Sequence, residues 1–194
     1  MEEDKLSTPA RLIVIGGSAG SLQVILKLFT DIKNTYPLSI VIVLHRSQTM
    51  ELLLEELIGY KTGLHVKELE EKEIPQPGWV YLCPPDYHLL FEKDKSFTLD
   101  YSEKINFSRP SIDVTFQSAA DVFGASLVCI LLSGANSDGA EGLAYVKQKG
   151  GITVVQHPDD AEVSYMPQQA LLRQKADYVL DTPALKSFIE RFSV

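Results

Sequence analysis

A short apolar run that breaks at glycines, close to the start of the chain, limits the possible folds more than any other feature of the sequence. Leu12–Ile15 contains no polar side chain, as is typical of a strand covered on both faces. Gly16, Gly17 and Gly20 permit a tight turn from that strand into a helix. The turn presents Ser18 either as a turn residue bonded to the backbone or as a nucleophile, and this stretch alone favours the turn residue.

The same alternation of buried strand, small-residue loop and amphipathic helix recurs along the chain. We predict core strands at Leu12–Ile15, Ser39–Leu44, Leu127–Leu132, Ile152–Gln156 and Tyr178–Leu180, and helices at Ser21–Lys33, Thr49–Ile58, Ser111–Phe123, Ala140–Lys149, from Pro167 and at Pro183–Phe192. Prolines separate four shorter strands, which favours turns around an antiparallel ribbon at His65–Glu68, Gly78–Leu82, Tyr87–Phe91 and Ser96–Tyr101. The predicted fold class is α/β, with a single doubly wound, mostly parallel sheet flanked by helices and an antiparallel β-hairpin insertion. We expect one domain over residues 1–194, in which residues 1–10 form a disordered N-terminal tail.

Composition excludes several classes of protein. The formal net charge of −8 on 194 residues leaves no excess of basic side chains for a nucleic-acid partner. No apolar run approaches the roughly 20 residues of a membrane span, and the acidic opening residues lack a signal-peptide pattern. We therefore expect a cytoplasmic protein with no direct membrane insertion. No metal or cofactor is expected, because the spacing of metal ligands is absent from the cysteines and from the scattered histidines, Cys83, Cys129, His65, His88 and His157.

Three side chains with complementary chemistry each follow the carboxyl end of a predicted core strand: Ser18, His45 and Asp138. Parallel strands end at one edge of a sheet, so the three are expected on one rim. Acyl transfer needs a hydroxyl, an imidazole that takes its proton and a carboxylate that orients the imidazole. Each also has a structural alternative, because a histidine after a strand is often packed and an aspartate between glycines is usually a turn residue or helix cap. The residues around Ser18 match the nucleophile elbow of α/β-hydrolases, but those enzymes supply the three groups in the order Ser, Asp, His.

Longer motifs carry a more specific signal than the glycine turn. They are RPSIDVTFQSAA (Arg109–Ala120), SGANSDGAEGL (Ser133–Leu143), GGITVVQ (Gly150–Gln156) and MPQQA (Met166–Ala170). Through them the chain resembles the catalytic domain of the chemotaxis-type protein-glutamate methylesterase family, also described as chemoreceptor methylesterase or glutamine deamidase. The resemblance extends from about Arg11 to Phe192. It implies that Ser18 is the nucleophile, His45 the general base and Asp138 the carboxylate that orients the base.

The resemblance also implies an activity and partners. The expected enzyme is a serine carboxyl-ester hydrolase that demethylates glutamyl methyl esters, or deamidates glutamines, on chemoreceptor-type signalling proteins. The backbone amides of Ala19 and Ala135 are the expected oxyanion donors. Arg109 either holds a substrate oxygen at the pocket edge or is a solvated charge at a helix entrance. No receiver domain is expected before residue 11, so control by a phosphorylatable receiver would come from another chain or from a larger polypeptide of which this chain is a piece, and a methyltransferase would act from another chain.

The chain departs from the family pattern at several loop positions. Ala19 replaces a threonine, Ala135 and Asn136 replace a methionine-glycine pair, and Tyr165 replaces a glycine. These changes are predicted to reshape the pocket more than they affect Ser18, His45 and Asp138. They also leave open an alternative function, a non-catalytic signalling module that keeps the fold and binds a receptor or a methyltransferase.

Overall fold

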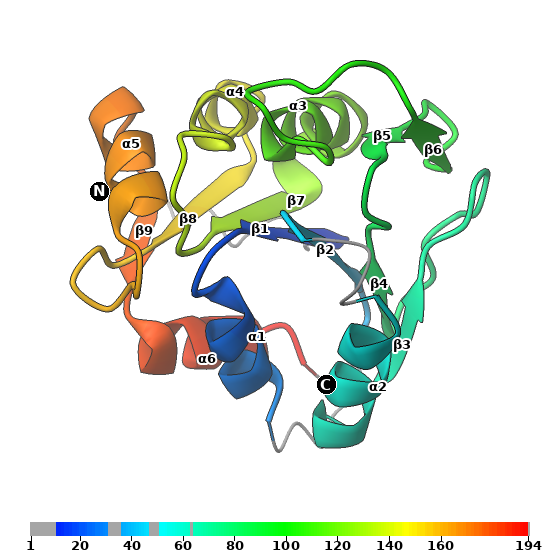
Figure 1. Ribbon diagram of the computed structural model, residues 1–194, viewed down its shortest axis with the longest axis horizontal. Helices are drawn as coiled ribbons and strands as arrows, with labels where there is room; N and C mark the ends of the chain where they lie inside the picture. The colour runs from blue at the N-terminus through cyan, green and yellow to red at the C-terminus, as the bar shows by residue number, and fades with distance from the viewer. Residues whose placement is uncertain (1–10, 31–35, 47–50, 63, 194) are drawn as a thin grey trace.

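The computed structural model describes residues 11–30, 36–46, 51–62 and 64–193. A seven-stranded sheet crosses its centre in the order β3-β4-β2-β1-β7-β8-β9, and every neighbouring pair is parallel (Figure 1). Its strands are β1 (Leu12–Gly17), β2 (Ser39–Leu44), β3 (His65–Glu68), β4 (Trp79–Leu82), β7 (Leu127–Leu131), β8 (Ile152–Gln156) and β9 (Tyr178–Leu180). A separate antiparallel pair consists of β5 (His88–Phe91) and β6 (Phe97–Asp100). The predicted fold class is confirmed.

Helices cover both faces of the parallel sheet (Figure 1). One face carries α1 (Ser21–Phe29), α2 (Glu51–Thr62) and α6 (Thr182–Glu190). The other carries α3 (Ile112–Phe123), α4 (Ala140–Gln148) and α5 (Tyr165–Arg173), with a short 3-10 turn at Gly124–Ser126 after α3. In the part of the chain that the structure describes, no helix has the length and apolar character needed to cross a membrane.

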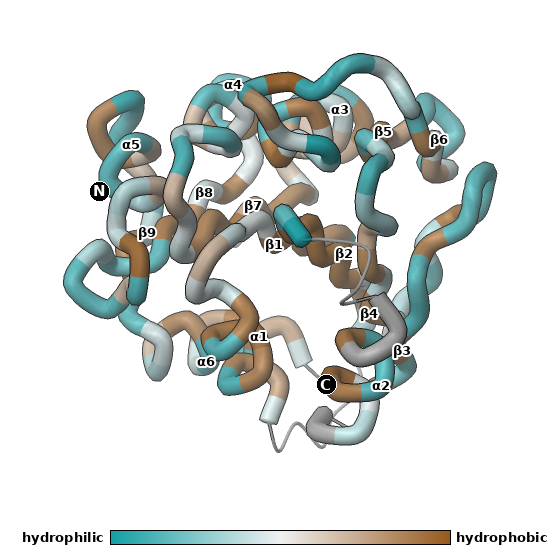
Figure 2. The backbone as a smooth tube through the Cα atoms, viewed as in Figure 1, coloured by the Kyte–Doolittle hydropathy of each residue, from teal (hydrophilic) through white to brown (hydrophobic). Residues whose placement is uncertain are grey.

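The apolar runs were visible in the sequence because the central strands are buried on both faces. In β1, Leu12 and Val14 pack toward the α3 side, whereas Ile13 and Ile15 pack toward the α1 side. All four side chains are fully buried. The apolar residues of the central strands form the brown centre of Figure 2. Strands covered on both sides read as continuous hydrophobic segments, and this signal located β1, β2, β7 and β8.

The expected antiparallel ribbon in the middle of the chain was partly wrong. The first two of its four strands, β3 and β4, belong to the parallel sheet, and only β5 and β6 form an antiparallel pair. β4 pairs with β2 from Ile40↔Val80 to Ile42↔Leu82, and its Val80, Tyr81 and Leu82 are all buried. Such short strands contain little signal about their partner, because the pairing that decides their direction is distant in sequence.

Several helix boundaries also differ from the sequence prediction. α1 ends at Phe29, because the backbone of the next residue, Thr30, is extended. The rest of the helix predicted to Lys33 lies in residues 31–35, outside the described residues. α2 continues past the predicted end to Thr62, and α5 begins at Tyr165, before Pro167. The predicted N-terminal tail, residues 1–10, lies outside the described residues as well.

Candidate active site

Strand register places Ser18 next to His45 at the carboxyl edge of the sheet. β1 and β2 are parallel neighbours with Gly17 opposite Leu44, so the next residue of each strand is Ser18 or His45. The backbone N–H of His45 donates to the carbonyl of Gly17 (3.2 Å) and holds the two ends together. After Ser18 the chain enters α1 through Gly20, whose φ of 81° lies in the left-handed region that glycine adopts without strain.

The loop after β7 carries Asp138 to the N-terminus of α3. Gly139, with a φ of 92°, is the N-cap of α4, so Asp138 is not the cap of that helix. Instead its carboxylate accepts hydrogen bonds from the backbone N–H groups of Ile112 (2.6 Å) and Asp113 (3.1 Å) and from the hydroxyl of Ser111 (2.9 Å). Asp138 therefore supports the N-terminus of α3 and does not cap α4, the helix that follows it in the chain.

The same carboxylate also contacts the imidazole of His45. Oδ2 of Asp138 lies 2.8 Å from Nε2 of His45, and Asp138 is fully buried. Burial by itself would raise the pKa of Asp138, but the hydrogen bonds from His45 and from the N–H groups of Ile112 and Asp113 hold that pKa below its usual value. Asp138 therefore stays ionised over the physiological range and faces His45 as an anion.

The hydroxyl of Ser18 is not hydrogen-bonded to His45 in this structure. Ser18 is half-buried, and its hydrogen bonds to other described residues use its backbone: its N–H donates to the carbonyl of Ser133 (2.9 Å), and its own carbonyl accepts from Ser21. Nucleophile and base often come into hydrogen-bond contact only when substrate is bound. Among the described residues, no hydrogen bond uses the N–H of Ala19 or Ala135, the two amides predicted to face an oxyanion.

A second buried carboxyl group, that of Asp113, neighbours Asp138. Asp113 is 6% exposed, its Oδ1 accepts from the backbone N–H of Gly142 (2.6 Å), and its Oδ2 accepts from Nδ2 of Asn106 (3.1 Å). Burial, followed by the neighbouring charge of Asp138, raises the pKa of Asp113 from 3.8 to about 7, although the hydrogen bond from Gly142 opposes the rise. The pair therefore holds one proton more readily than two isolated carboxylates would.

Replacing Asp113 with asparagine should make the protein more stable above neutral pH. Between pH 3.8 and about 7 the folded chain keeps a proton on Asp113 that the unfolded chain releases, so the free energy of unfolding falls as pH rises through that window. Asparagine mimics the protonated acid and removes this loss. Urea unfolding should show that Asp113→Asn gains stability relative to the parent between pH 5 and pH 8, by on the order of 2 to 4 kcal/mol.

A matched control for this test is Asp121→Asn, at the other end of α3. Asp121 is exposed, and its bond to Lys149 (2.7 Å) lowers its pKa, so this variant should gain nothing at pH 8. An identical pH dependence of stability in Asp113→Asn and the parent would contradict the raised pKa.

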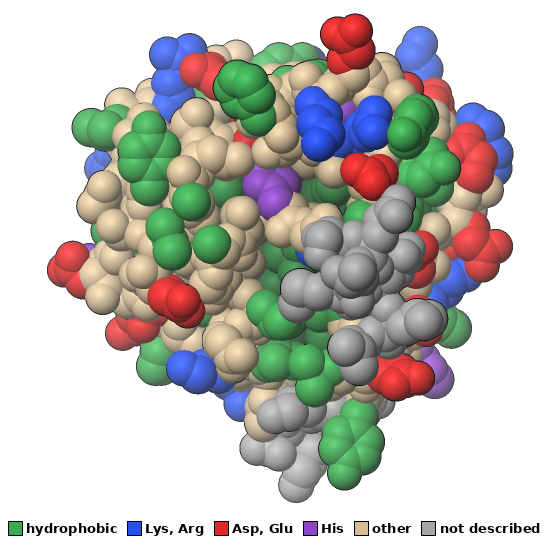
Figure 3. All heavy atoms as spheres, in the orientation of Figure 1, with side chains coloured by type: hydrophobic (Ala, Val, Ile, Leu, Met, Phe, Trp, Pro, Cys, Tyr) green, Lys and Arg blue, Asp and Glu red, His purple; other side chains and the backbone are tan. Residues whose placement is uncertain are grey.

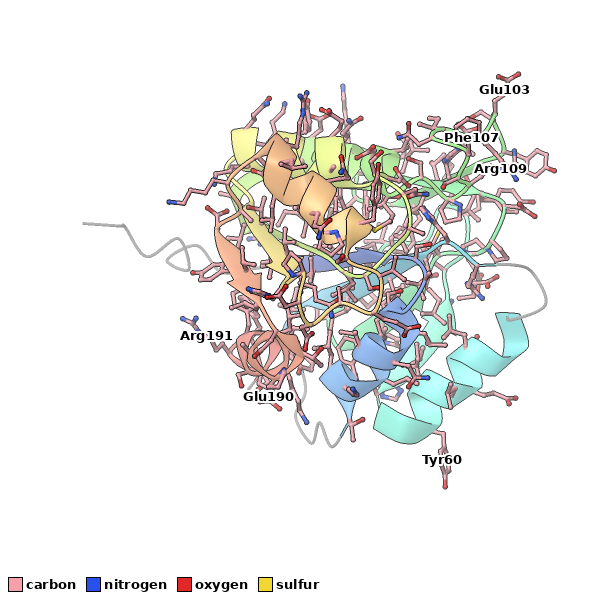
Figure 4. All side chains as sticks on the ribbon, turned by 60° about the vertical axis from the view of Figure 1, so that its left-hand side comes forward. Tyr60, Glu103, Phe107, Arg109, Glu190 and Arg191 are labelled. Atoms are coloured by element: carbon pink, nitrogen blue, oxygen red, sulfur yellow. The ribbon has the colours of Figure 1, made fainter. Side chains whose placement is uncertain are left out.

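Arg109 lies at a corner of the molecule with Glu103 and Phe107, and all three side chains project outward (Figure 4). Nη1 of Arg109 donates to the carbonyls of Tyr101 (3.3 Å) and Ser102 (2.7 Å), and the guanidinium stacks on the ring of Tyr101 at 3.9 Å. These contacts hold the segment between β6 and α3. A substrate contact for Arg109 stays a prediction, and it would have to use Nη2.

Three residues contribute to the site without having been predicted to do so. Ser111 is the N-cap of α3, and its hydroxyl also reaches Asp138. The buried His88 accepts from the backbone N–H of Ser111 at Nδ1 (3.0 Å) and contacts the carbonyl of Glu103 at Nε2 (2.9 Å). Nδ2 of Asn136 lies 3.5 Å from Nδ1 of His45. The only signal for Asn136 in the sequence is its departure from the family's glycine.

No thiol competes with Ser18 as a nucleophile at this rim. Cys83 and Cys129 are free and buried, and burial raises the pKa of both thiols. Among the described residues, no three His, Cys, Asp or Glu side chains gather as a metal ion would require.

The space-filling view shows how charged side chains are distributed over one face of the molecule. Figure 3 shows a histidine side chain near the middle of one face of the molecule, with acidic and basic side chains interspersed around the periphery. Neither sign of charge covers that face.

Comparison with known proteins agrees with the fold and the motifs. The profile of the CheB methylesterase family matches residues 13–189. A protein of Leptospira interrogans, named provisionally as a protein-glutamate methylesterase/protein-glutamine glutaminase, is 44% identical over 172 residues, which cover 87% of each chain. A Thermotoga maritima protein-glutamate methylesterase/protein-glutamine glutaminase is 32% identical over 94% of this chain, and the match spans 53% of that protein.

Comparison with a solved structure supports the same fold and family. The crystal structure of the Thermotoga maritima CheB methylesterase catalytic domain has a TM-score of 0.86 with this chain at 30% identity, and the match covers 93% of this chain and 100% of that domain. Family profile, relatives and fold agree, and the chain belongs to the CheB methylesterase family.

Proposed function

We propose that this chain is a serine esterase that hydrolyses glutamyl methyl esters on a chemoreceptor-type signalling protein and releases methanol. The observation that carries the proposal is the hydrogen-bonded pair of His45 and Asp138 beside Ser18, in a member of the CheB methylesterase family. The named relatives are protein-glutamate methylesterase/protein-glutamine glutaminases, so a glutamine side chain is the second proposed substrate, with ammonia as its leaving group.

The proposed reaction proceeds through an acyl-enzyme. The oxygen of Ser18 attacks the ester carbonyl while His45 takes its proton, and the carbonyl oxygen becomes an oxyanion. The intermediate collapses, the bond to the methoxy group breaks, and His45 returns the proton so that methanol leaves. Water then attacks the acyl-enzyme in the same way and releases glutamate and free Ser18.

Three features of the structure support these roles. His45 can give its Nε2 proton to the ionised Asp138 as a hydrogen bond, which leaves Nδ1 as the basic nitrogen. The N–H groups of Ala19 and Ala135 are the proposed oxyanion donors, since no bond to a described residue occupies them. Arg109 is proposed to contact substrate at the rim through Nη2, the nitrogen that its bonds to Tyr101 and Ser102 do not use.

The alternative of a non-catalytic module is not favoured. Such a module would have no need of an ionised buried carboxylate held against a histidine, because that arrangement costs desolvation energy. A cytoplasmic location and control by a receiver or methyltransferase on another chain remain proposals from the sequence.

The direct test is methanol release from a methylated receptor by the purified protein. We expect release above the uncatalysed background, and we expect a fluorophosphonate to label Ser18 at the same time, because it traps an activated serine. A folded protein that neither releases methanol nor reacts with the probe would contradict the proposal and favour the non-catalytic module.

A further inference from the structure

Asn136 uses both ends of its side-chain amide inside the site. Its Oδ1 accepts from the backbone N–H of Asp138 (3.2 Å), and its Nδ2 donates to the hydroxyl of Ser108 (3.1 Å). The same Nδ2 lies 3.5 Å from Nδ1 of His45. Asn136 therefore approaches the imidazole from the side opposite Asp138.

These contacts determine which way the amide faces. A backbone N–H can only donate, so the oxygen of Asn136 must face Asp138, and the –NH2 group must face Ser108 and His45. An –NH2 group cannot accept a hydrogen bond, so Nδ1 of His45 must carry its lone pair rather than a proton. The proton is then on Nε2, the nitrogen that lies 2.8 Å from Asp138. The two sides of the ring require the same tautomer.

We propose that Asn136 is a positioning residue that selects the tautomer of neutral His45 in which Nδ1 is free of a proton. The inference rests on the proposed function, in which Nδ1 is the base. A proton on Nδ1 would point at the hydrogens of the Asn136 amide, so the tautomer that carries it is disfavoured. At 3.5 Å the contact is long and weak, so the hydroxyl of Ser18 can replace it when substrate binds.

The other charged groups near His45 are few. Asp138 faces its Nε2, with Asp113 behind it in α3. Arg46 follows His45 in the chain and is paired with Glu68 (3.2 Å), and Glu162 packs against Gly20 in the turn after Ser18. The carboxylate of Asp138 is held by the backbone of Ile112, and the guanidinium of Arg46 by the carbonyl of Cys83. The backbone N–H of Asp138 also donates to Oδ1 of Asn136, a bond that Asn136→Asp keeps and Asn136→Ala loses.

The test compares Asn136→Ala and Asn136→Asp with the parent. The rate falls at low pH because imidazolium cannot take the proton of Ser18, and this acid limb is read from kcat/KM. Asn136→Ala removes the opposing dipole and should move the limb up by about 0.3 pH unit. Asn136→Asp keeps the oxygen that accepts from Asp138 but puts a carboxylate beside Nδ1, so it should move the limb up by about one pH unit or more.

The order of these shifts separates the proposal from a purely structural role of the loop. If Asn136 only supported the loop, the isosteric Asn136→Asp would resemble the parent and Asn136→Ala would differ most. That order would overturn the proposal. Ser137→Asp is the matched control: it adds the same charge one residue along on an exposed side chain, and it should move the limb by less than half as much.

A second measurement does not depend on turnover. Nitrogen chemical shifts of the His45 ring should report a proton on Nε2 in the parent and a larger share of the tautomer with a proton on Nδ1 in Asn136→Ala. A proton on Nδ1 in the parent would overturn the inference. Should the parent release no methanol, the proposed function would fail, while these shifts would still decide whether Asn136 sets the tautomer.

Discussion

Ser18→Ala is expected to lower methanol release by roughly 10⁵-fold or more while the melting temperature stays within about 2 °C of the parent. The hydroxyl supplies the bond to substrate, but it makes no hydrogen bond to another described residue. The contacts that shape the turn are backbone bonds to Ser133 and Ser21, which alanine keeps. Thermal unfolding and a methanol assay on the same preparations measure both effects.

The control for this variant is Ser137→Ala. Ser137 is an exposed serine in the neighbouring loop before α4, so its loss should leave turnover and probe labelling within about twofold of the parent. The fluorophosphonate should modify the parent and Ser137→Ala but not Ser18→Ala. Labelling at Ser21 or at Ser133 would contradict the assignment of the nucleophile, and so would a Ser18→Ala variant with parental turnover.

The placement of Ser18 beside His45 could be predicted because it follows from local signals. Each residue ends a continuous apolar strand, and strands joined by a helix pair in parallel, so their carboxyl ends meet. The role of each side chain came from its chemistry and from the family resemblance. The carboxyl ends of three parallel strands at one edge of the sheet were enough to predict where the site lies. The side-chain contacts did not have to be known.

The contacts around Asp138 could not be predicted in the same way. Its partners lie at the start of α3 and directly after β2, far away in sequence, and they are brought together because the loop after β7 approaches the start of α3 closely. Gly139 permits that approach, because a side chain there would meet Leu131 and Ile112 within 3 Å. An aspartate followed by a glycine predicts a turn, but the neighbouring residues do not indicate which helix the carboxylate will contact.

The short strands of the middle segment were misplaced for a related reason. β3 contains no buried residue, since His65 is exposed and the other three are half-buried, so it has no apolar run that would mark it as part of a parallel sheet. Its position depends on β4, which in turn pairs with β2. Prolines around these strands favoured a ribbon of hairpins, and the long-range pairing overrode that local preference.

Asp138→Asn is expected to lose both activity and stability, because the carboxylate serves His45 and α3 together. Each oxygen of Asp138 accepts a backbone N–H, Oδ1 from Asp113 and Oδ2 from Ile112. In asparagine one oxygen becomes an –NH2 group, so one N–H of α3 faces another donor in either orientation. An unsatisfied buried donor costs about 1 to 3 kcal/mol, which corresponds to roughly 5 °C in melting temperature for a chain of this size.

The loss of activity in Asp138→Asn should be much larger than its loss of stability can explain. An –NH2 group facing His45 favours the tautomer with its proton on Nδ1, which cannot take the proton of Ser18, and the equivalent change in a serine protease costs about 10⁴ in turnover. We expect a loss of roughly 10³-fold or more, assayed at least 15 °C below the transition. Thr115→Val is the matched control. It removes a buried hydroxyl of α3 that donates to the carbonyl of Leu89 (3.0 Å), and it touches neither His45 nor Asp138. It should melt at a similarly lowered temperature and keep turnover within about threefold of the parent, whereas a fully active Asp138→Asn would leave Asp138 with the support of α3 as its only role.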